Sequence, residues 1–360
     1  MPKSNAKPPS PAPLIEAVYG SIPDELVEVP PSAVQCAPRV PGARLLSDMA
    51  PGSLARLVMY APPSTIERRH EIALALRALA PGAALTVVAA NSKGGNRLAD
   101  EVAAFGCAIA ASHRRKHRII DTQRPEHPSR LDDALASGLP RLLSEMDLWT
   151  QPGLFSWDRL DPGSALLATH LPTLSGRGAD LGCGIGVLAR AVRQRSPEVA
   201  SITLIDIDAR ALDMALRNVP GTGVTTLWAD VRTARNLPTL LDFVVMNPPF
   251  HDGGAEDRAL GQVFIAKAAG MLRPGGVLWL TANRHLPYEA TLKTHFASVT
   301  PVADGGGYKI VCAEKAARAP RLDRSAARTD RNDAAVQDHP ELTRTRPKSA
   351  RARPTSRNRT

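Results

Sequence analysis

One short motif carries the most specific chemistry of this 360-residue sequence. An apolar run over residues 243–246 stops at Asn247, Pro248, Pro249 and Phe250. An exocyclic amine on a planar ring is a poor nucleophile because its lone pair is delocalised. The Asn247 side chain and the Pro248 carbonyl can accept hydrogen bonds from its N–H groups, which favours localisation of the lone pair. The two prolines stiffen the loop and so preorganise these acceptors.

Phe250 completes the motif with a flat apolar face. A planar acceptor extracted from its helix or loop can stack on such a ring. The motif therefore predicts group transfer to the amine of a planar acceptor, with catalytic roles for Asn247, Pro248, Pro249 and Phe250. The alternative is an ordinary Asn-Pro turn at the end of a strand, which is common. Its coincidence with the fourth strand of an alternating α/β pattern favours the catalytic interpretation.

A glycine-rich turn lies one βαβαβ unit upstream of this motif. Asp180 precedes it, and glycines follow at Gly182, Gly184 and Gly186. Without a Cβ the backbone can pass close to a ligand, and a helix that begins there offers free N–H groups. These four residues are therefore predicted to bind a cofactor. A dinucleotide site is the competing interpretation, but its G-x-G-x-x-G pattern needs a glycine where Val187 stands.

Two acids follow the next two expected strands. Asp206 comes about 20 residues after the turn, where a carboxylate can accept hydrogen bonds from both ribose hydroxyls. Its alternative role is to cap a helix, which suits Asp208 better. Asp230 is placed to accept a hydrogen bond from an adenine amino group. The glycine turn, Asp206 and Asp230 each follow an expected strand, and together they favour S-adenosylmethionine over NAD as the cofactor. Asn247 is also predicted to bind the cofactor.

The elements that must position these residues alternate between helix and strand from residue 165 onward. This alternation predicts an α/β fold with a Rossmann-like, doubly wound sheet. Helices are expected over 165–171, from 187 and around 211–216, and strands over 178–181, 202–206, 224–228, 241–246, 276–282 and 308–313.

Residues 14–145 show a second α/β pattern that lacks a cofactor loop. Strands are expected over 55–60 and 84–90, with a second helix near Arg97. Ser64 and Glu67 match a capping box that would open the first helix. Neither strand leads into a glycine loop that ends in an acid, so only the second half of the chain is expected to bind the cofactor.

Between the two halves, residues 146–164 are rich in Pro and Gly but also carry Phe155, Trp157, Asp158 and Asp161. We interpret this segment as a linker and lid over the pocket of the second half. The alternative is an interdomain contact in which both aromatic side chains are buried.

Positive charge is concentrated in two places. Residues 318–360 hold 12 Lys and Arg against 5 Asp and Glu, which accounts for seven of the ten net positive charges. This tail and residues 1–13 have too little apolar surface to offset ordering entropy and are predicted to be disordered. The tail and the basic cluster at 113–118 can neutralise RNA phosphates, although the alternative for each is an exposed, solvated charge run.

Several classes of protein are disfavoured. Cys36, Cys107, Cys183 and Cys312 show no C-x-x-C spacing, so neither a metal site nor a disulfide framework is expected. No apolar stretch approaches the roughly 18 residues of a membrane span, and residues 1–13 do not match a signal peptide. We therefore expect a cytoplasmic protein that does not associate with membranes.

Together these motifs resemble the class I guanine-N2 rRNA methyltransferases of the RsmC/RlmG kind. The resemblance runs from about residue 153 to 313, and its motifs are Asp180-Leu-Gly-Cys-Gly-Ile-Gly186, Asp206, Asn247-Pro-Pro-Phe-His-Asp-Gly253, Ala282-Asn-Arg-His-Leu-Pro-Tyr288 and Tyr308-Lys309. It implies a catalytic domain over 165–317 that methylates the N2 amine of a guanine in ribosomal RNA of the small subunit. It also implies that residues 14–145 are a degenerate copy of that domain, which has lost cofactor binding and helps to bind RNA.

Other functions share part of the motif. Asn-Pro-Pro followed by an aromatic residue also serves adenine-N6 methylation of DNA and glutamine methylation of release factors. Phe250 followed by His-Asp-Gly favours the guanine group. An inactive RNA-binding scaffold is the remaining alternative, and the intact Asn247 and glycine turn disfavour it.

Overall fold

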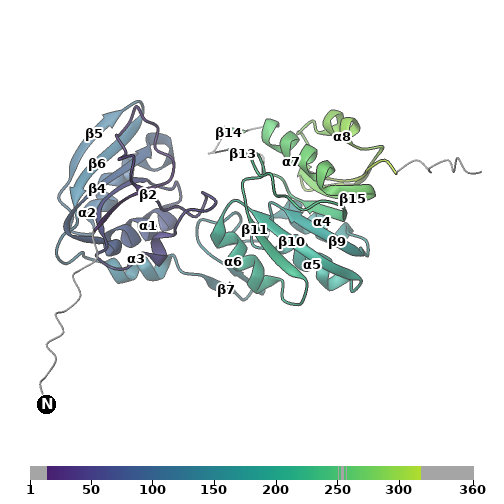
Figure 1. Cartoon of the computed structure of the whole chain (residues 1–360), viewed down its shortest axis with the longest axis horizontal. Coiled ribbons are helices and arrows are strands. Elements are labelled where there is room, and N and C mark those ends of the chain that lie inside the picture. The colour runs from purple at the N-terminus through teal and green to yellow at the C-terminus, as the bar shows by residue number, and fades with distance from the viewer. Residues whose placement is uncertain (1–13, 250, 253–254, 257, 318–360) are drawn as a thin grey trace, which may run out of the picture. The chain divides into compact units, whose positions relative to one another are not determined.

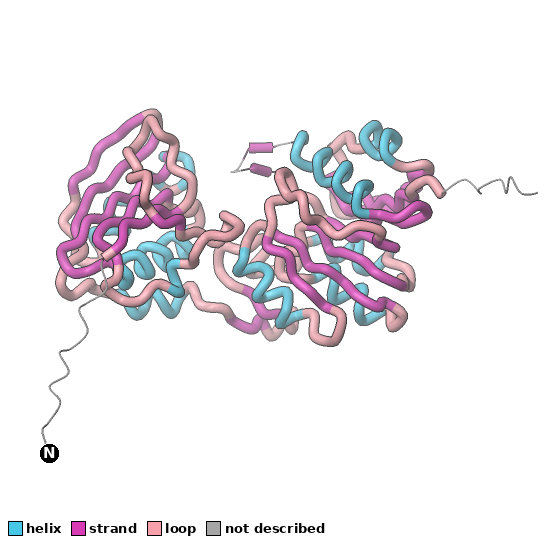
Figure 2. Tube along the Cα trace, viewed as in Figure 1, coloured by secondary structure: helices cyan, strands magenta, loops and turns pink. Residues whose placement is uncertain are grey.

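The structure, a computed structural model, describes residues 14–249, 251–252, 255–256 and 258–317. Phe250 and the two tails predicted to be disordered, 1–13 and 318–360, lie outside the described residues. The described chain contains two large sheets, each flanked by helices (Figure 1, Figure 2), and two small two-stranded sheets. Over these ranges no helix combines the length and the apolar character that a membrane crossing requires.

The C-terminal half is built on a seven-stranded sheet in the order β11-β10-β9-β12-β15-β17-β16. All neighbours are parallel except β17, which is antiparallel to both of its neighbours. The order reverses between β9 and β12, which opens a crevice at the carboxyl ends of these strands. The predicted Rossmann-like α/β fold is confirmed. The strands are β9 (Gly176–Leu181), β10 (Val199–Asp206), β11 (Val224–Trp228), β12 (Leu241–Met246), β15 (Leu272–Asn283), β16 (Ser298–Gly305) and β17 (Tyr308–Glu314).

The centre of this sheet is buried on both faces. Val244 and Val245, neighbours on β12, are each fully buried but belong to cores on opposite faces of the sheet. A central parallel strand covered on both sides needs such an apolar run, which is why the strand 241–246 matches its predicted bounds. The strand at the edge of the sheet, 224–228, also has the predicted bounds. The helices are α4 (Pro162–His170), α5 (Val187–Arg195), α6 (Ala209–Asn218), α7 (Arg258–Met271) and α8 (Glu289–His295), and a two-stranded sheet joins β13 (His251–Asp252) to β14 (Ala255–Glu256).

The N-terminal half repeats most of this topology. Its sheet order is β2-β1-β3-β4-β6-β5, with antiparallel pairing only at β4-β6 and β6-β5. This corresponds strand for strand to β10-β9-β12-β15-β17-β16. The elements are β1 (Ile15–Tyr19), β2 (Val34–Gln35), η1 (Leu46–Asp48), β3 (Leu54–Tyr60), α1 (Thr65–Ala78), β4 (Leu79–Ala90), η2 (Asn91–Lys93), η3 (Gly95–Arg97), α2 (Leu98–Ala103), β5 (Ala110–Arg114), β6 (His117–Gln123) and α3 (Leu131–Ser137). The hairpin of β7 (Arg141–Leu143) and β8 (Leu148–Thr150) follows.

The equivalence of β3 and β12 extends to the loops that follow them. Residues 61–63, Ala-Pro-Pro, follow β3, just as residues 247–249, Asn-Pro-Pro, follow β12. The N-terminal half has thus kept both prolines but has an alanine in place of the amide. The two halves therefore share both a strand order and a proline pair after the equivalent strand.

In the N-terminal half the place beside these prolines is filled by Arg68, which is fully buried. Its Nη1 donates hydrogen bonds to the carbonyls of Pro62 at 3.1 Å and Pro63 at 2.8 Å. The same guanidinium donates to both carboxylate oxygens of Glu101, at 2.5 and 2.8 Å. A bidentate buried pair of this kind is strong and directional. The N-terminal equivalent of the Asn-Pro-Pro loop is therefore closed by a side chain of the protein.

The predicted capping box of α1 was wrong in its contacts. Ser64 stands at the N-cap position but its side chain makes no cap hydrogen bond. Glu67 instead accepts a 2.7 Å hydrogen bond from Nη2 of Arg210 in the C-terminal half. A buried guanidinium is a stronger partner for a carboxylate than a single backbone N–H.

Candidate active site

A cavity of about 390 Å³ lies at the carboxyl ends of β9, β10 and β12. This volume is within the range of small-molecule sites. A narrower pocket adjoins this cavity. Phe155, Gly182, Gly184 and Asn247 line both. Between them the two pockets are lined by most of the residues predicted from sequence: Asp180, Gly182, Gly184, Asp206, Asp230, Asn247, Pro248 and Pro249. The crevice at the switch point of the sheet thus brings together predicted residues that are up to 69 positions apart in sequence, from Asp180 to Pro249.

Gly186 is the exception among the described residues predicted for this site. It is buried at the N-cap of α5 with a φ of 85°. A Cβ added there would lie 3.0 Å from the Val219 side chain and 3.1 Å from Ala215. Its position indicates close packing of the loop against α6, and it lines neither of the two pockets.

Asp180 lies at the base of the narrower pocket and is almost fully buried. Its Oδ2 accepts a hydrogen bond from the Ala189 N–H at 2.9 Å, while Oδ1 has no hydrogen-bond partner among the described residues. Burial, aided by the charge of Asp206, raises the pKa of Asp180 to about 7. A buried carboxylate with an unused oxygen is costly unless a positive group neutralises it.

Asp206 ends β10 and binds the glycine turn directly. Its Oδ2 accepts a hydrogen bond from the Gly184 N–H at 2.8 Å, and its Oδ1 accepts one from the Asp208 N–H at 2.9 Å. Burial raises its pKa to about 6, against the opposing effect of these hydrogen bonds. Each carboxylate oxygen can accept more than one hydrogen bond, so capacity remains for ligand hydroxyls. Asp208 caps α6 by accepting from the Arg210 N–H, as the sequence predicts.

Asp230 lines the cavity but is already engaged. Its carboxylate accepts hydrogen bonds from Arg232 Nε, at 3.0 Å to each oxygen, and from Nη2 at 2.8 Å. Arg232 lowers the pKa of Asp230 through these hydrogen bonds. An adenine amino group at this carboxylate would share it with Arg232, a partner that the sequence analysis did not anticipate.

Asn247 is held by two residues from the start of α4. Its Nδ2 donates to Asp161 Oδ2 at 2.8 Å and to Ser164 Oγ at 2.9 Å. Because an ionised carboxylate only accepts hydrogen bonds, the amide NH₂ must face Asp161. The carbonyl oxygen Oδ1 is therefore turned away from Asp161 and is fixed in orientation. Asp161 also caps α4 by accepting from the Ser164 N–H at 2.7 Å.

This supporting role of Asp161 and Ser164 is not evident from the sequence. A signal was present, because an Asp followed by Pro162 at the first helical position is typical of a helix start. The helix therefore begins three residues earlier than predicted. What the sequence could not reveal is that the capping carboxylate also binds an amide 86 residues away.

The rest of the segment 146–164 only partly fits the two interpretations given for it. Phe155 is 57% exposed and borders both pockets, and Leu154 is buried beside it. The alternative in which both aromatic side chains are buried is wrong for Phe155. The interpretation of this segment as a lid stays a prediction.

The basic cluster at 113–118 spans the turn of the β5–β6 hairpin and the strand residues beside it. Residues 113–116 are exposed, and Arg115 and Lys116 have positive φ angles of 45° and 62°. Arg115 pairs with Glu25 at 3.0 Å, and Arg114 donates to backbone carbonyls of the same loop. Arg114 and Arg115 of the cluster therefore already have partners within the protein.

Over the described residues, no group of three or more His, Cys, Asp and Glu side chains is arranged to hold a metal.

Both the sequence and the fold of this chain are similar to those of known methyltransferases. Residues 145–312 match the family model of the methyltransferase small domain. The ribosomal RNA small subunit methyltransferase C of Pseudomonas aeruginosa strain LESB58 is 32% identical over 282 residues, which cover 77% of this chain and 84% of the relative. The protein of the same name from Shewanella sp. strain MR-4 is 38% identical over 164 residues, covering 46% and 48% of the two chains.

Among solved structures, the T. thermophilus 16S rRNA N2 methyltransferase RsmC, determined in complex with AdoMet and guanosine, has the same fold. The match has a TM-score of 0.66 and 23% identity, and covers 84% of this chain and 89% of that one. Both halves are therefore included in the likeness. Given the identity and the coverage of the Pseudomonas relative, this chain belongs to the ribosomal RNA small subunit methyltransferase C family.

Proposed function

We propose that this methyltransferase transfers a methyl group from S-adenosylmethionine to the exocyclic N2 amine of a guanine in 16S ribosomal RNA. The observation that carries the proposal is the Asn247 amide, whose NH₂ is fixed by Asp161 and Ser164 beside the cavity. The names of the relatives support the choice of ribosomal RNA, and the guanosine-bound RsmC structure supports guanine.

The described residues fit S-adenosylmethionine as the cofactor. Gly182 and Gly184 would lie against it, and Asp206 would accept hydrogen bonds from its ribose hydroxyls. The unused Oδ1 of Asp180 offers a negative charge to a cationic ligand at the narrower pocket. When bound, the cofactor supplies a methyl group activated by a sulfonium.

The chain's own residues would prepare the acceptor. Asn247 Oδ1 and the Pro248 carbonyl would each accept one N–H of the amine, which directs its lone pair out of conjugation. Pro248 is buried and Pro249 partly so, which keeps both acceptors fixed. The role of Phe250, stacking on the base, rests on the sequence alone. An amide oxygen is a weak base, so the proton lost after transfer would pass on to water.

The proposed assignment of regions follows from this chemistry. Residues 165–317 would be the catalytic domain, 146–164 its lid, and 14–145 the degenerate half that assists RNA binding. The partner would be ribosomal RNA or the small subunit, and the cytoplasm, where ribosomes are assembled, would be the site of action.

The test supplies the full-length protein and radiolabelled S-adenosylmethionine with naked 16S rRNA, small subunits, duplex DNA or a release factor. After digestion, we expect label in N2-methylguanosine from one of the ribosomal substrates. Label in N6-methyladenine or in methylated glutamine would show that the acceptor is not guanine. No label in any acceptor would favour an inactive RNA-binding scaffold. Asn247→Ala should abolish the signal, while Asn96→Ala, which alters an exposed amide in the N-terminal half, should preserve it.

A further inference from the structure

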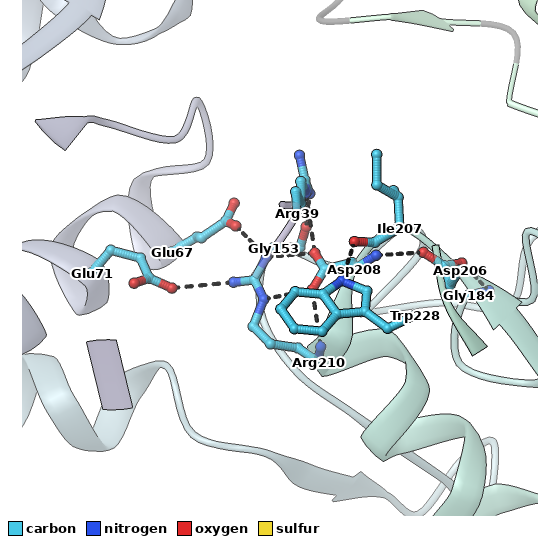
Figure 3. Close-up of polar contacts among 10 residues, drawn as sticks. All are labelled: Arg39, Glu67, Glu71, Gly153, Gly184, Asp206, Ile207, Asp208, Arg210 and Trp228. Carbon is cyan, nitrogen blue, oxygen red and sulfur yellow. Dashed lines mark hydrogen bonds and ion pairs between the residues drawn. The ribbon is translucent and has the colours of Figure 1, made fainter. Parts of the chain in front are cut away.

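Arg39 belongs to the N-terminal half but lines the cavity of the C-terminal half. The preceding residue fixes its backbone, because the Pro38 carbonyl accepts a 2.9 Å hydrogen bond from the N–H of Ala209 at the start of α6. The side chain of Arg39 then reaches two groups at the cavity (Figure 3). Nε donates to Asp208 Oδ2 at 3.1 Å, and Nη2 donates to the Gly153 carbonyl at 3.1 Å.

Asp208 is thereby held between two guanidinium groups. Arg210 donates to it through Nε, at 3.0 Å to Oδ1, and through Nη2, at 2.7 Å to Oδ2, the oxygen that also accepts from Arg39 (Figure 3). Burial alone would raise the pKa of Asp208, but Arg210 and Arg39 outweigh this effect and hold it at about 2. The carboxylate is therefore ionised and fixed at physiological pH.

This fixed carboxylate is coupled to the predicted ribose acceptor. The backbone N–H of Asp208 donates to Asp206 Oδ1, and the other oxygen of Asp206 holds the glycine turn at Gly184. Any shift of Asp208 would move the N–H that orients Asp206. Arg39 is thus two hydrogen bonds away from the cofactor-binding carboxylate, and its charge also acts on it, since it lowers the Asp206 pKa.

The opposite end of the network is anchored in α1. Arg210 donates to Glu67 Oε1 at 2.7 Å and to Glu71 Oε1 at 3.4 Å. The side chains of all three residues are at least nine-tenths buried. Unpairing one member of such a buried group leaves an uncompensated charge, so the arrangement resists displacement. The N-terminal half therefore supplies a rigid base for the Asp208 end of the cavity.

Arg39 also ties down the segment that borders the cavity. Gly153, whose carbonyl it binds, has a φ of 97°, and a Cβ added there would lie 2.4 Å from Glu67 Cδ. The next two residues, Leu154 and Phe155, form part of the cavity wall. One guanidinium thus joins the wall segment after Gly153 to the loop that follows β10.

We propose that Arg39 is a cofactor-positioning residue that the degenerate N-terminal half contributes to the catalytic site. The inference rests on the proposed binding of S-adenosylmethionine at this cavity. Arg39 fixes Asp208, and through it the Asp206 carboxylate that receives the ribose, and it holds the Leu154 wall in place. The half that has lost its own cofactor loop completes the site of the other half.

The charge of Arg39 adds a pH-dependent signature. The charged and titratable groups around Asp206 are the carboxylates of Asp208 and Asp180, the thiol of Cys183, and Arg39. Removal of Arg39 takes away a positive charge and raises the Asp206 pKa further. A protonated Asp206 is a poorer acceptor for two hydroxyls, so cofactor binding by Arg39→Ala should weaken most at low pH.

The experiment is calorimetric titration of the full-length protein with S-adenosylmethionine at pH 8 and pH 6. Arg39→Ala should bind about ten-fold more weakly than wild type at pH 8, with a larger loss at pH 6. Arg39→Lys should restore the pH profile but only part of the affinity, because an ammonium cannot fork between Asp208 and Gly153. Arg44→Ala, which alters an exposed arginine five residues along the same segment, should bind within two-fold of wild type.

The proposal is overturned if Arg39→Ala binds the cofactor like wild type at both pH values. Methyl-transfer assays on the same variants give the KM for each substrate. The proposal is also overturned if the KM for RNA rises while cofactor binding is unchanged, which would make Arg39 a phosphate contact. Equal losses in Arg39→Ala and Arg39→Lys with an unchanged pH profile would reduce Arg39 to a packing role and overturn it too. If the wild-type protein itself did not bind S-adenosylmethionine, the proposed function would fail. That outcome differs from a failure of the Arg39 proposal, in which the wild type binds and the variants bind equally well.

Discussion

Oε1 of Glu67 accepts a hydrogen bond from Nη2 of Arg210 over 2.7 Å, although the two residues are 143 positions apart and belong to different halves of the chain. Both side chains are at least nine-tenths buried. The pair joins α1 of the N-terminal half to α6 of the C-terminal half, beside the Asp208 carboxylate. Stability of the protein and geometry of the cofactor site therefore depend on the same contact.

Glu67→Gln should lower the free energy of unfolding by about 1–3 kcal/mol, the scale for leaving a buried hydrogen-bonded partner unsatisfied. Arg210 retains Glu71 and Asp208, so the variant should still fold. Urea unfolding measures the change, with Glu126→Gln as a matched control at an exposed glutamate in the same half. Equal stability of the two variants would contradict a structural role for the pair.

Asn247→Ala should reduce methyl transfer by about 100-fold or more, the scale for removing a preorganised transition-state partner. Cofactor affinity should change little, because the proposed role of Asn247 is at the acceptor amine. Single-turnover assays with saturating S-adenosylmethionine, combined with calorimetry, separate the two quantities. An active Asn247→Ala enzyme would exclude the mechanism.

Asp161→Asn should lower kcat by about ten-fold, since the new amide no longer dictates which end of Asn247 faces it. An asparagine can still cap α4, so helix stability should be nearly preserved. The measurement is kcat and KM for both substrates, together with a thermal unfolding curve. A rise in the KM for S-adenosylmethionine with unchanged kcat would place Asp161 at the cofactor instead.

The raised pKa values predict opposite pH trends for stability and for cofactor binding. Burial raises the pKa of Asp206 to about 6 and that of Asp180 to about 7, both from 3.8. Between pH 4 and 7 the folded protein thus binds more protons at these groups than the unfolded chain does. Their contribution to stability is present at low pH and is lost as the pH rises through 6 and 7. Binding of a cationic cofactor needs the ionised carboxylates and should strengthen over the same interval.

Thermal unfolding with and without S-adenosylmethionine from pH 5 to 8 tests both trends. The increase in Tm caused by the cofactor should be small at pH 5 and largest near pH 8. Asp180→Asn should flatten the pH dependence of the ligand-free protein, because the amide does not titrate. A cofactor effect that is constant across this range would contradict the assignment of these carboxylates to the site.

The tail at 318–360 lies outside the described residues, and its role stays a prediction from its charge. Its deletion should flatten the salt dependence of RNA binding, because each phosphate contact adds about 0.7 to the log–log slope on single strands. A neutral tail of the same length provides the control for chain length. Equal slopes for all three proteins would identify the tail as a solubilising segment.

The parts of the fold that sequence predicts best are those determined by local pattern. The strand 241–246 reads correctly because a strand buried on both faces must be continuously apolar. The glycine turn and the strand-end acids at 206 and 230 reach the cavity because parallel strands present their carboxyl ends at one edge.

Contacts between distant residues were beyond such reasoning. The spacing of Ser64 and Glu67 fits a capping box, yet Glu67 binds an arginine that only the tertiary fold brings near. Asp161 likewise carries a local signal as a helix cap, while its contact with Asn247 depends on how α4 packs against β15 and β17. The sequence predicts most of the residues that line the pockets, and the side chains that hold them in place became evident from the structure.

Arg68 gives the N-terminal half a property that the catalytic half lacks. A guanidinium has N–H donors along its planar edge, much like the amine edge of a base, and here it is covalently attached where the other half would receive one. The carbonyls of Pro62 and Pro63 are therefore already bound from within the chain, so an extracted base would find this place taken. From the half closed in this way, Glu67 and Arg39 reach Arg210 and Asp208 of the other half.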